Sequence, residues 1–228
     1  VMFRASKPKR KKIISEGPKK QAKVEKEEKQ APSQQQEVNQ QSIEPGKDAE
    51  DAAAAGPGPS SEAAERAETF KELGLSDWLC AVCKSLGMSR PTQVQNGCIP
   101  AILNGKDVIG LAQTGSGKTA AFALPILQRL AKDPYGIYAV VLTPTRELAV
   151  QIAEQFRALG AGMSLRDCVV IGGVDMQAQA KELARRPHVV IATPGRLRGL
   201  LEADVNLAKG FARAAFLVLD EADRLLDA

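Results

Sequence analysis

The sequence predicts an α/β domain built on an open, doubly wound parallel sheet, and two patterns carry this prediction. Short runs rich in Val, Ile and Leu recur from residue 70 onward and show little polar alternation, as strands buried on both faces do. Segments with the apolar spacing of helices separate these runs. In such a sheet, ligands bind at the loops that follow the carboxyl ends of the strands.

Five candidate strands follow one another along this part of the chain. A Gly-rich turn and a helix over the sequence AAFALPILQRL come after the first, and a helix over RELAVQIAEQFRALG comes after the second. Strands that alternate with helices indicate crossover connections, and therefore parallel neighbours. The predicted strands are Val108–Leu111, Tyr138–Leu142, Cys168–Ile171, Val189–Ala192 and Phe216–Leu219.

Residues 1–67 have a different composition and are predicted to form a disordered basic and polar tail. They mix Lys, Glu, Gln, Ala, Pro and Gly and contain almost no aromatic residues, so they cannot bury enough apolar surface to offset the entropy of ordering. The run Lys7-Pro8-Lys9-Arg10-Lys11-Lys12 is dense in charge. It is either a solvated run, or a nuclear address or RNA-contacting arm.

The bulk composition excludes some classes of protein. The 228 residues carry a formal charge of +4, which is compatible with a nucleic-acid partner but does not indicate one. No apolar run approaches the ~20 residues that a membrane crossing needs, so we expect no membrane partner. The first residues lack the apolar core of a secretory signal. Four cysteines in a chain of this size fit a reducing compartment.

Cys80 and Cys83 form a CxxC pair, which raises the question of zinc. A structural zinc site needs further nearby Cys or His ligands, and Cys98, Cys168 and the lone His188 are isolated in the sequence. We therefore predict that Cys80 and Cys83 lie three residues apart on one helix face and pack there as small apolar side chains.

The turn after the first strand, Ala112-Gln113-Thr114-Gly115-Ser116-Gly117-Lys118-Thr119, has the features of a phosphate-binding P-loop, although its first residue is Ala where the strict pattern has Gly. Glycines let backbone N–H groups surround phosphate oxygens, and the following helix adds the positive end of its dipole. Lys118 is expected to reach the β and γ phosphates, and the Thr119 hydroxyl to bind Mg²⁺. The predicted nucleotide-binding residues here are Thr114, Gly115, Ser116, Gly117, Lys118 and Thr119.

The last strand ends in two adjacent carboxylates, Asp220 and Glu221. An apolar strand that delivers acidic residues to the same sheet edge as a P-loop is the Walker B arrangement. Asp220 is expected to hold Mg²⁺, and Glu221 to act as the general base for the attacking water. Lys118, Asp220 and Glu221 are therefore the predicted catalytic residues.

Residues 220–223 spell DEAD, and the sequence from about residue 69 resembles the first RecA-like domain of a DEAD-box RNA helicase. Further matches follow in the family's order, and Gly87 to Gln95 resemble the adenine-reading Q motif. These matches are Pro144-Thr145-Arg146-Glu147-Leu148-Ala149, Gly172-Gly173 and Thr193-Pro194-Gly195-Arg196.

The resemblance implies further roles. Gln95 would read adenine through its amide, as glutamine does in other adenine sites, with Phe70 as the upstream aromatic of the ATP site. Met88 departs from the aromatic residue usual at its position. Asp223 would couple the two domains of the helicase. The implied RNA-binding residues contact the RNA backbone without reading sequence: Pro144, Thr145, Arg146, Gly172, Gly173, Thr193, Pro194, Gly195 and Arg196.

The expected protein is an ATP-dependent RNA helicase that locally unwinds RNA duplexes, with ATP and Mg²⁺ as its cofactors. The residues that flank the motifs resemble those of the ribosome-biogenesis branch of the family. This resemblance implies rRNA processing and a nuclear, nucleolar location. The predicted regions are a tail at 1–67, a Q-motif region at 68–96 and a RecA-like domain at 97–228, with a second RecA-like domain expected in the intact chain. The alternatives are a non-catalytic RNA-binding scaffold and a DNA-directed translocase.

Overall fold

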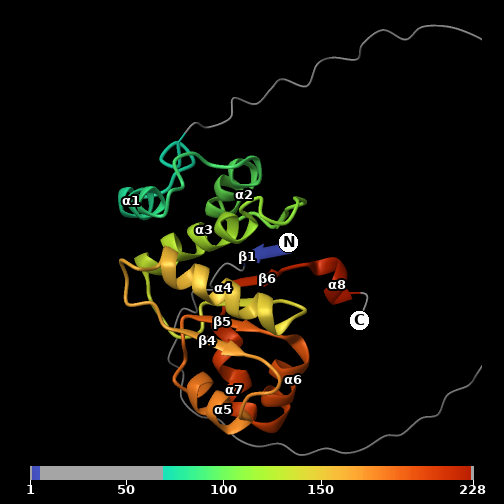
Figure 1. The fold of residues 1–228 in the computed structure, drawn as a ribbon. Coiled ribbons are helices and arrows are strands. Elements are labelled where there is room, and N and C mark those ends of the chain that lie inside the picture. The colour runs from blue at the N-terminus through green and yellow to red at the C-terminus, as the bar shows by residue number, and fades with distance from the viewer. Residues whose placement is uncertain (1, 6–68, 227–228) are drawn as a thin grey trace, which may run out of the picture. The chain divides into compact units, whose positions relative to one another are not determined.

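A six-stranded sheet with helices on both faces organises the residues that the structure describes, which are 2–5 and 69–226. The structure is a computed structural model. The strands follow the order β2-β1-β6-β3-β5-β4 across the sheet, and Figure 1 shows the chain path through them. Their bounds are β1 (Met2–Ala5), β2 (Val108–Ile109), β3 (Ala139–Leu142), β4 (Asp167–Val170), β5 (Val189–Ala192) and β6 (Phe216–Leu219).

The parallel sheet predicted from the sequence is confirmed. Strand β3 pairs in parallel with β5 on one side and with β6 on the other, and β4 pairs in parallel with β5. All five predicted strands are present, and β5 and β6 have the predicted bounds. Since parallel strands end at one edge of a sheet, the loops after β3, β4, β5 and β6 gather at that edge.

Strand β1 corrects part of the tail prediction. Residues 2–5 pair antiparallel with both β2 and β6, so that Met2 lies opposite Ile109 on one side and Leu219 on the other. The run Met2-Phe3-Arg4-Ala5 contains none of the Val, Ile or Leu residues that mark the other strands, so no strand was predicted there. Pairing on both sides satisfies its backbone groups. The rest of the predicted tail, including the basic run at 7–12, lies outside the described residues.

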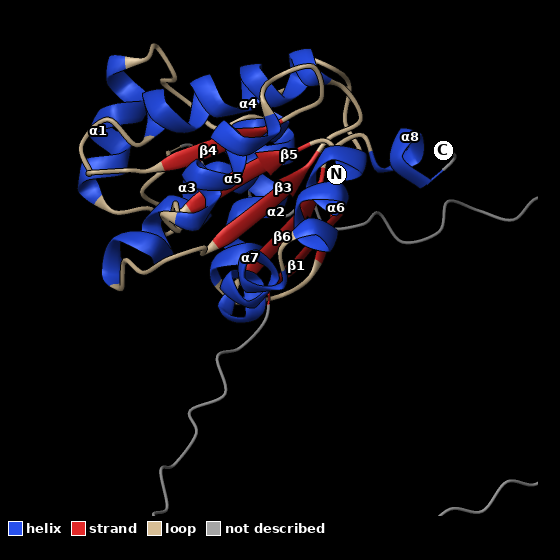
Figure 2. Cartoon of the chain, turned by 90° about the horizontal axis from the view of Figure 1, so that it is seen from below, coloured by secondary structure: helices blue, strands red, loops and turns tan. Residues whose placement is uncertain are grey.

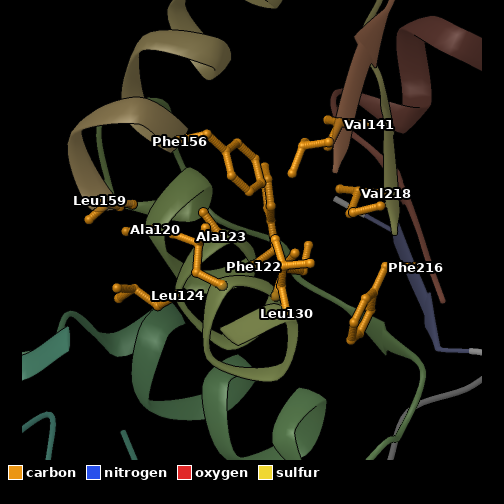
Figure 3. Close-up of a cluster of buried hydrophobic side chains, with 14 of the residues drawn as sticks. Ala120, Phe122, Ala123, Leu124, Leu130, Val141, Phe156, Leu159, Phe216 and Val218 are labelled. Atoms are coloured by element: carbon orange, nitrogen blue, oxygen red, sulfur yellow. The ribbon is translucent and has the colours of Figure 1, made fainter. Parts of the chain in front are cut away.

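Four helices pack on one face of the sheet: α1 (Asp77–Ser85), α2 (Gln93–Leu103), α3 (Lys118–Lys132) and α4 (Arg146–Leu159). Their apolar side chains form one core cluster with residues of β3, β5 and β6. In Figure 3, side chains of α3 lie between Phe156 of α4 and the strand residues Val141 and Val218. The Phe122 and Phe156 rings are 6.1 Å apart between centroids.

A second cluster covers the opposite face, beneath α5 (Met176–Ala184), α6 (Pro194–Ala203) and α7 (Val205–Gly210). Val140 and Val190 belong to this cluster, whereas their chain neighbours Val141 and Ile191 belong to the first. This alternation explains why the strands read as continuous apolar runs. Figure 2 shows helices on both sides of the strands. A short 3₁₀ turn (Phe211–Arg213) precedes β6, and α8 (Ala222–Leu226) follows it.

The region before the P-loop is part of the same core. Helix α2 spans the predicted boundary between residues 96 and 97, so that boundary does not separate two structural units. Cys80 and Cys83 both lie on α1, Cys83 is fully buried in the first cluster, and Cys80 packs against it, as predicted. Burial raises the pKa of the Cys83 thiol to about 11, which keeps it protonated near neutral pH.

None of the helices in the described part of the chain combines the length and the apolar character that a membrane crossing requires.

Candidate nucleotide and nucleic-acid sites

The loop between β2 and α3 has the backbone of a phosphate-binding turn. Gly115 and Gly117 adopt positive φ angles of 81° and 88°, which a glycine reaches without steric cost. Lys118 is the first residue of α3, and its Nζ atom donates to the Ala112 carbonyl oxygen at 2.7 Å, so the side chain folds back over the loop. The Ser116 hydroxyl is buried without a partner among the described residues. These features suit a ligand with several acceptor oxygens.

The P-loop and the end of β6 line one open cleft of about 480 Å³. Thr114 and Lys118 lie on its P-loop side, and Glu221, Asp223 and Arg224 on the side of β6 and α8. The structure therefore brings the two sequence motifs together, although about a hundred residues separate them. The apolar residues Ile109, Leu111 and Leu226 complete much of the lining.

Asp220 is buried at the end of β6. Its backbone N–H donates to the Leu142 carbonyl oxygen of β3 at 2.8 Å, and the residue is only 7% exposed. Burial raises the pKa of the Asp220 carboxyl; the charge of Glu221 raises it further, whereas Lys118 lowers it. A desolvated carboxylate of this kind is a strong candidate for cation binding, because a cation offsets the cost of burying the charge.

Glu221 adopts a left-handed backbone conformation, with φ at 49°, which is uncommon for a residue other than glycine. Its Oε2 atom accepts a hydrogen bond from Nη1 of Arg224 at 3.0 Å. Backbone strain of this type concentrates at functional sites, where the surrounding fold holds it in place.

Gln95 joins the Q-motif region to the P-loop. Its Oε1 accepts from the Thr92 N–H at 3.0 Å, and its Nε2 donates to the Gly117 carbonyl oxygen at 3.2 Å. The side chain is 2% exposed. Each end of the amide is thus engaged within the protein, and the predicted adenine contact would use the remaining hydrogen and lone pair.

The two residues expected to flank the base lie in different surroundings. Phe70 is 4% exposed within the first core cluster, so its ring offers no open face for stacking and the predicted base contact is not supported. Met88 is half-buried and packs only partly against that cluster. The sequence showed an aromatic residue but could not show that neighbouring helices cover it.

A second, larger cleft of about 740 Å³ lies at the ends of β3, β4 and β5. Helices α4, α5 and α6 all begin around it, and the first turn of a helix presents unpaired N–H groups and a positive dipole end. All predicted RNA-binding residues except Gly173 line it. The lining residues are Pro144, Thr145, Arg146, Glu147, Gly172, Met176, Thr193, Pro194, Gly195, Arg196 and Gly199.

Arg146 lies directly over the Gly172-Gly173 turn. A Cβ atom added at Gly172 would lie 3.1 Å from Arg146 Nη2, and one added at Gly173 would also crowd the guanidinium. Arg196 donates from Nη2 to the Val174 carbonyl oxygen at 3.1 Å, on the other side of this turn. Three motifs that are distant in the sequence therefore pack together. The guanidinium groups of Arg146 and Arg196 lie beside the cleft, which suits anionic phosphates.

Sequence reasoning missed several residues at this cleft. Met176 and Gly199 line it, and nothing in their spacing indicated this. Glu147 lines it too; it belongs to the motif that begins at Pro144, but no RNA contact was predicted for it. Gln179 of α5 is buried and donates from Nε2 to the Ile171 carbonyl oxygen at 2.9 Å, which fastens the helix to the strand end before the glycine turn. The surrounding sequence, MQAQAKELA, contained no signal for this contact.

Comparison with known proteins agrees with this geometry. Residues 92–228 match the family described as DEAD/DEAH box helicase. The chain belongs to this DEAD/DEAH box helicase family. A solved DEAD-box protein from the hyperthermophile Methanococcus jannaschii superposes with a TM-score of 0.62 at 35% identity, over 71% of this chain and 43% of that one.

Curated DEAD-box relatives are more similar in sequence. DEAD-box ATP-dependent RNA helicase 36 of Oryza sativa subsp. japonica is 67% identical, over 70% of this chain and 32% of its own. Probable ATP-dependent RNA helicase DDX49 of Homo sapiens is 63% identical, over 69% and 32%. ATP-dependent rRNA helicase RRP3 of Yarrowia lipolytica is 55% identical, over 73% and 34%. The chain thus spans about a third of the length of these relatives.

Proposed function

We propose that this chain is the ATP-binding domain of an ATP-dependent RNA helicase that remodels or locally unwinds RNA duplexes. The observation that carries the proposal is the placement of two clefts at one edge of one sheet. One cleft joins a P-loop to Glu221, the chain neighbour of the buried Asp220, and the other is lined by arginines and helix starts. A single sheet edge can therefore connect nucleotide binding to the binding of a phosphate backbone.

ATP is the substrate of the first cleft. We propose that backbone N–H groups from Thr114 to Thr119 hold its phosphates and that Lys118 leaves the Ala112 carbonyl to pair with them. Gln95 would contact adenine through the free half of its amide. Glu221 would take a proton from the water whose oxygen attacks the γ phosphorus as the bond to ADP breaks.

Mg²⁺ is the proposed metal, with Thr119 and Asp220 as its protein ligands. No group of three or more His, Cys, Asp or Glu side chains that could hold a metal is present among the described residues. A small number of protein ligands fits Mg²⁺, which usually keeps waters and nucleotide phosphates in its shell. When bound, the ion supplies positive charge against the phosphate oxygens.

RNA is the proposed ligand of the second cleft, bound through its phosphates and sugars. Two arginines and three helix starts offer donors that fit phosphate oxygens but do not distinguish bases. RNA in this cleft would therefore be bound without regard to sequence. The relatives named as RNA helicases support RNA over DNA.

A second RecA-like domain is the proposed partner, and Asp223 the residue that couples to it. Large apolar side chains at the rim of the nucleotide cleft are exposed: Ile109 by 66%, Leu111 by 90% and Leu226 by 71%. Apolar residues gathered beside a polar site indicate a surface that another domain covers. The relatives are about three times as long as the matched segment, which leaves room for such a domain.

The proposed process is rRNA maturation during ribosome biogenesis, with a nuclear and nucleolar location. The support is the similarity to proteins named as rRNA helicases from Yarrowia lipolytica and Schizosaccharomyces pombe. Within the chain, residues 69–228 are proposed as the RecA-like unit, with the Q-motif region included because α2 joins the two parts.

Matched RNA and DNA duplexes test the proposal in a form of the protein that carries both helicase domains. ATP-dependent separation of the RNA duplex, with little separation of the DNA duplex, is the expected result. Binding of RNA without any separation or ATP hydrolysis would indicate a scaffold module. Equal or better separation of DNA would indicate a translocase and contradict the assignment.

A further inference from the structure

We propose that Arg224 is a positioning residue that directs the carboxylate of Glu221 for catalysis. The inference rests on the proposed function, in which Glu221 is the general base. It adds a residue that lies just beyond the DEAD run and that no sequence pattern singled out.

The contact between the two side chains is specific. Nη1 of Arg224 donates to Oε2 of Glu221 at 3.0 Å, and both residues line the nucleotide cleft. Among the residues that the structure describes, the other carboxylate oxygen, Oε1, has no hydrogen-bond partner. One oxygen is therefore fixed, and the other is left to accept a proton from water.

The backbone around this pair restricts the carboxylate further. Glu221 stands in the left-handed region, with φ at 49°, and α8 begins at the next residue. Arg224 lies in this helix, and its side chain reaches back to Glu221, which directly precedes the first helical residue. The backbone conformation of Glu221 limits the directions in which its side chain can point, and the hydrogen bond from Arg224 fixes one of them.

The exposure of the two side chains indicates that their contact orients the Glu221 carboxylate more than it stabilises the fold. The Arg224 side chain is 64% exposed and that of Glu221 is 25% exposed. Ion pairs at such exposure contribute little to folding. The rate of a proton transfer, in contrast, depends steeply on the placement of the base. The loss of Arg224 should therefore affect turnover and leave the fold intact.

Steady-state RNA-stimulated ATP hydrolysis tests this in the form that carries both helicase domains. Arg224→Gln is expected to lower kcat roughly tenfold, the effect of a misplaced catalytic group, and to change KM for ATP by less than about twofold, since the nucleotide contacts remain. Arg224→Lys should recover most of the rate, because an ammonium can still pair with Glu221. In the Glu221→Gln background, Arg224→Gln should cause no further loss.

Arg198→Gln is the matched control. Arg198 also pairs with a glutamate on its own helix, Glu202 at 2.7 Å, is 79% exposed, and lines neither cleft. Equal rates for Arg224→Gln and Arg198→Gln would overturn the inference, as would a raised KM with unchanged kcat, or a further loss in the Glu221→Gln background. A parent protein that hydrolyses no ATP with RNA present would overturn the proposed function, and this inference with it.

Discussion

Lys118 shows how one residue depends on its loop. Its ammonium bonds to the Ala112 carbonyl of its own P-loop, and it begins the helix whose dipole faces the cleft. This contact keeps the cation at the mouth of the loop, where phosphates are expected to replace the carbonyl.

Lys118→Ala is expected to weaken ATP binding by roughly 10²-fold or more, because a charge-assisted contact to the β and γ phosphates is lost. Titration with a fluorescent ATP analogue measures this. Lys132→Ala, at the exposed far end of the same helix, is the control and should bind as the parent does. Near-parental affinity in Lys118→Ala would contradict the P-loop assignment.

Asp220→Asn is expected to stabilise the nucleotide-free protein and to raise its melting temperature, because it removes a buried charge. Burial raises the pKa of this carboxyl, so the folded state binds protons more readily than the unfolded state. The charge therefore costs most stability above the folded pKa, and the cost disappears as the pH falls toward the unfolded value.

Melting curves of the parent and of Asp220→Asn over a range of pH test whether the Asp220 charge lowers the stability of the protein. The difference in melting temperature should be largest near neutral pH and should shrink in acid. A variant that is less stable than the parent at neutral pH would show that the carboxylate is not a desolvation cost in the free protein.

At the scale of elements, the sequence predicted the sheet well because parallel strands buried on both faces leave a strong signal. Val189–Ala192 and Phe216–Leu219 were found with their observed bounds. The loop before α3 and Glu221 line one cleft, and Asp220 directly follows β6, because strand ends of a parallel sheet converge at one edge.

Other features could not be read in this way. Strand β1 contains no Val, Ile or Leu and pairs with strands that lie more than a hundred positions away, so no local pattern encodes it. The burial of Phe70 depends on helices that pack over it, and residue type alone does not report this. Met176 and Gly199 reach the second cleft through helix packing, which spacing along the chain does not reveal.

Gly117→Ala tests the joint between α2 and the P-loop. A Cβ at this position would collide with the Gln95 amide nitrogen, and the positive φ of 88° would be strained for alanine. We expect a lower melting temperature, by roughly the 1 kcal/mol or more that an incompatible φ costs, and a loss of ATP binding.

Gly97→Ala provides the comparison for this variant. Gly97 is exposed within α2, and a Cβ there would meet nothing within 4 Å. Alanine should be neutral or stabilising at this helical position. Equal melting temperatures and equal ATP binding for the two variants would show that the contact between Gln95 and the P-loop contributes neither to stability nor to ATP affinity.

At the scale of the whole molecule, the two clefts share one sheet but neither is closed. The nucleotide cleft opens to solvent beside exposed apolar side chains, and the larger cleft presents cations without an opposing wall in the described part of the chain. Water exclusion and a cation against the transferring phosphoryl group would have to come from a partner domain.

Residues 1–228 alone are expected to bind nucleotide weakly and to show no RNA-stimulated ATP hydrolysis. The missing cationic partner alone is worth ~10³–10⁵ in rate in related chemistry. With about three phosphate contacts, RNA affinity should fall with a slope near −2 against log salt for single strands. The measurement compares RNA-stimulated phosphate release by this chain and by the two-domain form. Strong stimulation in the chain alone would show that a second domain is not required for ATP hydrolysis.

The position of Arg146 over the Gly172-Gly173 turn has a consequence for how these sites can change during evolution. The guanidinium occupies the space that a side chain at either glycine would enter, but it is the far end of a flexible side chain and can move aside. Gly173 is constrained by its own backbone, because residues with a Cβ atom rarely adopt its φ of 81°. Among homologues, Gly173 should therefore vary less than Gly172, whose replacement by a small residue requires only that the arginine side chain shift.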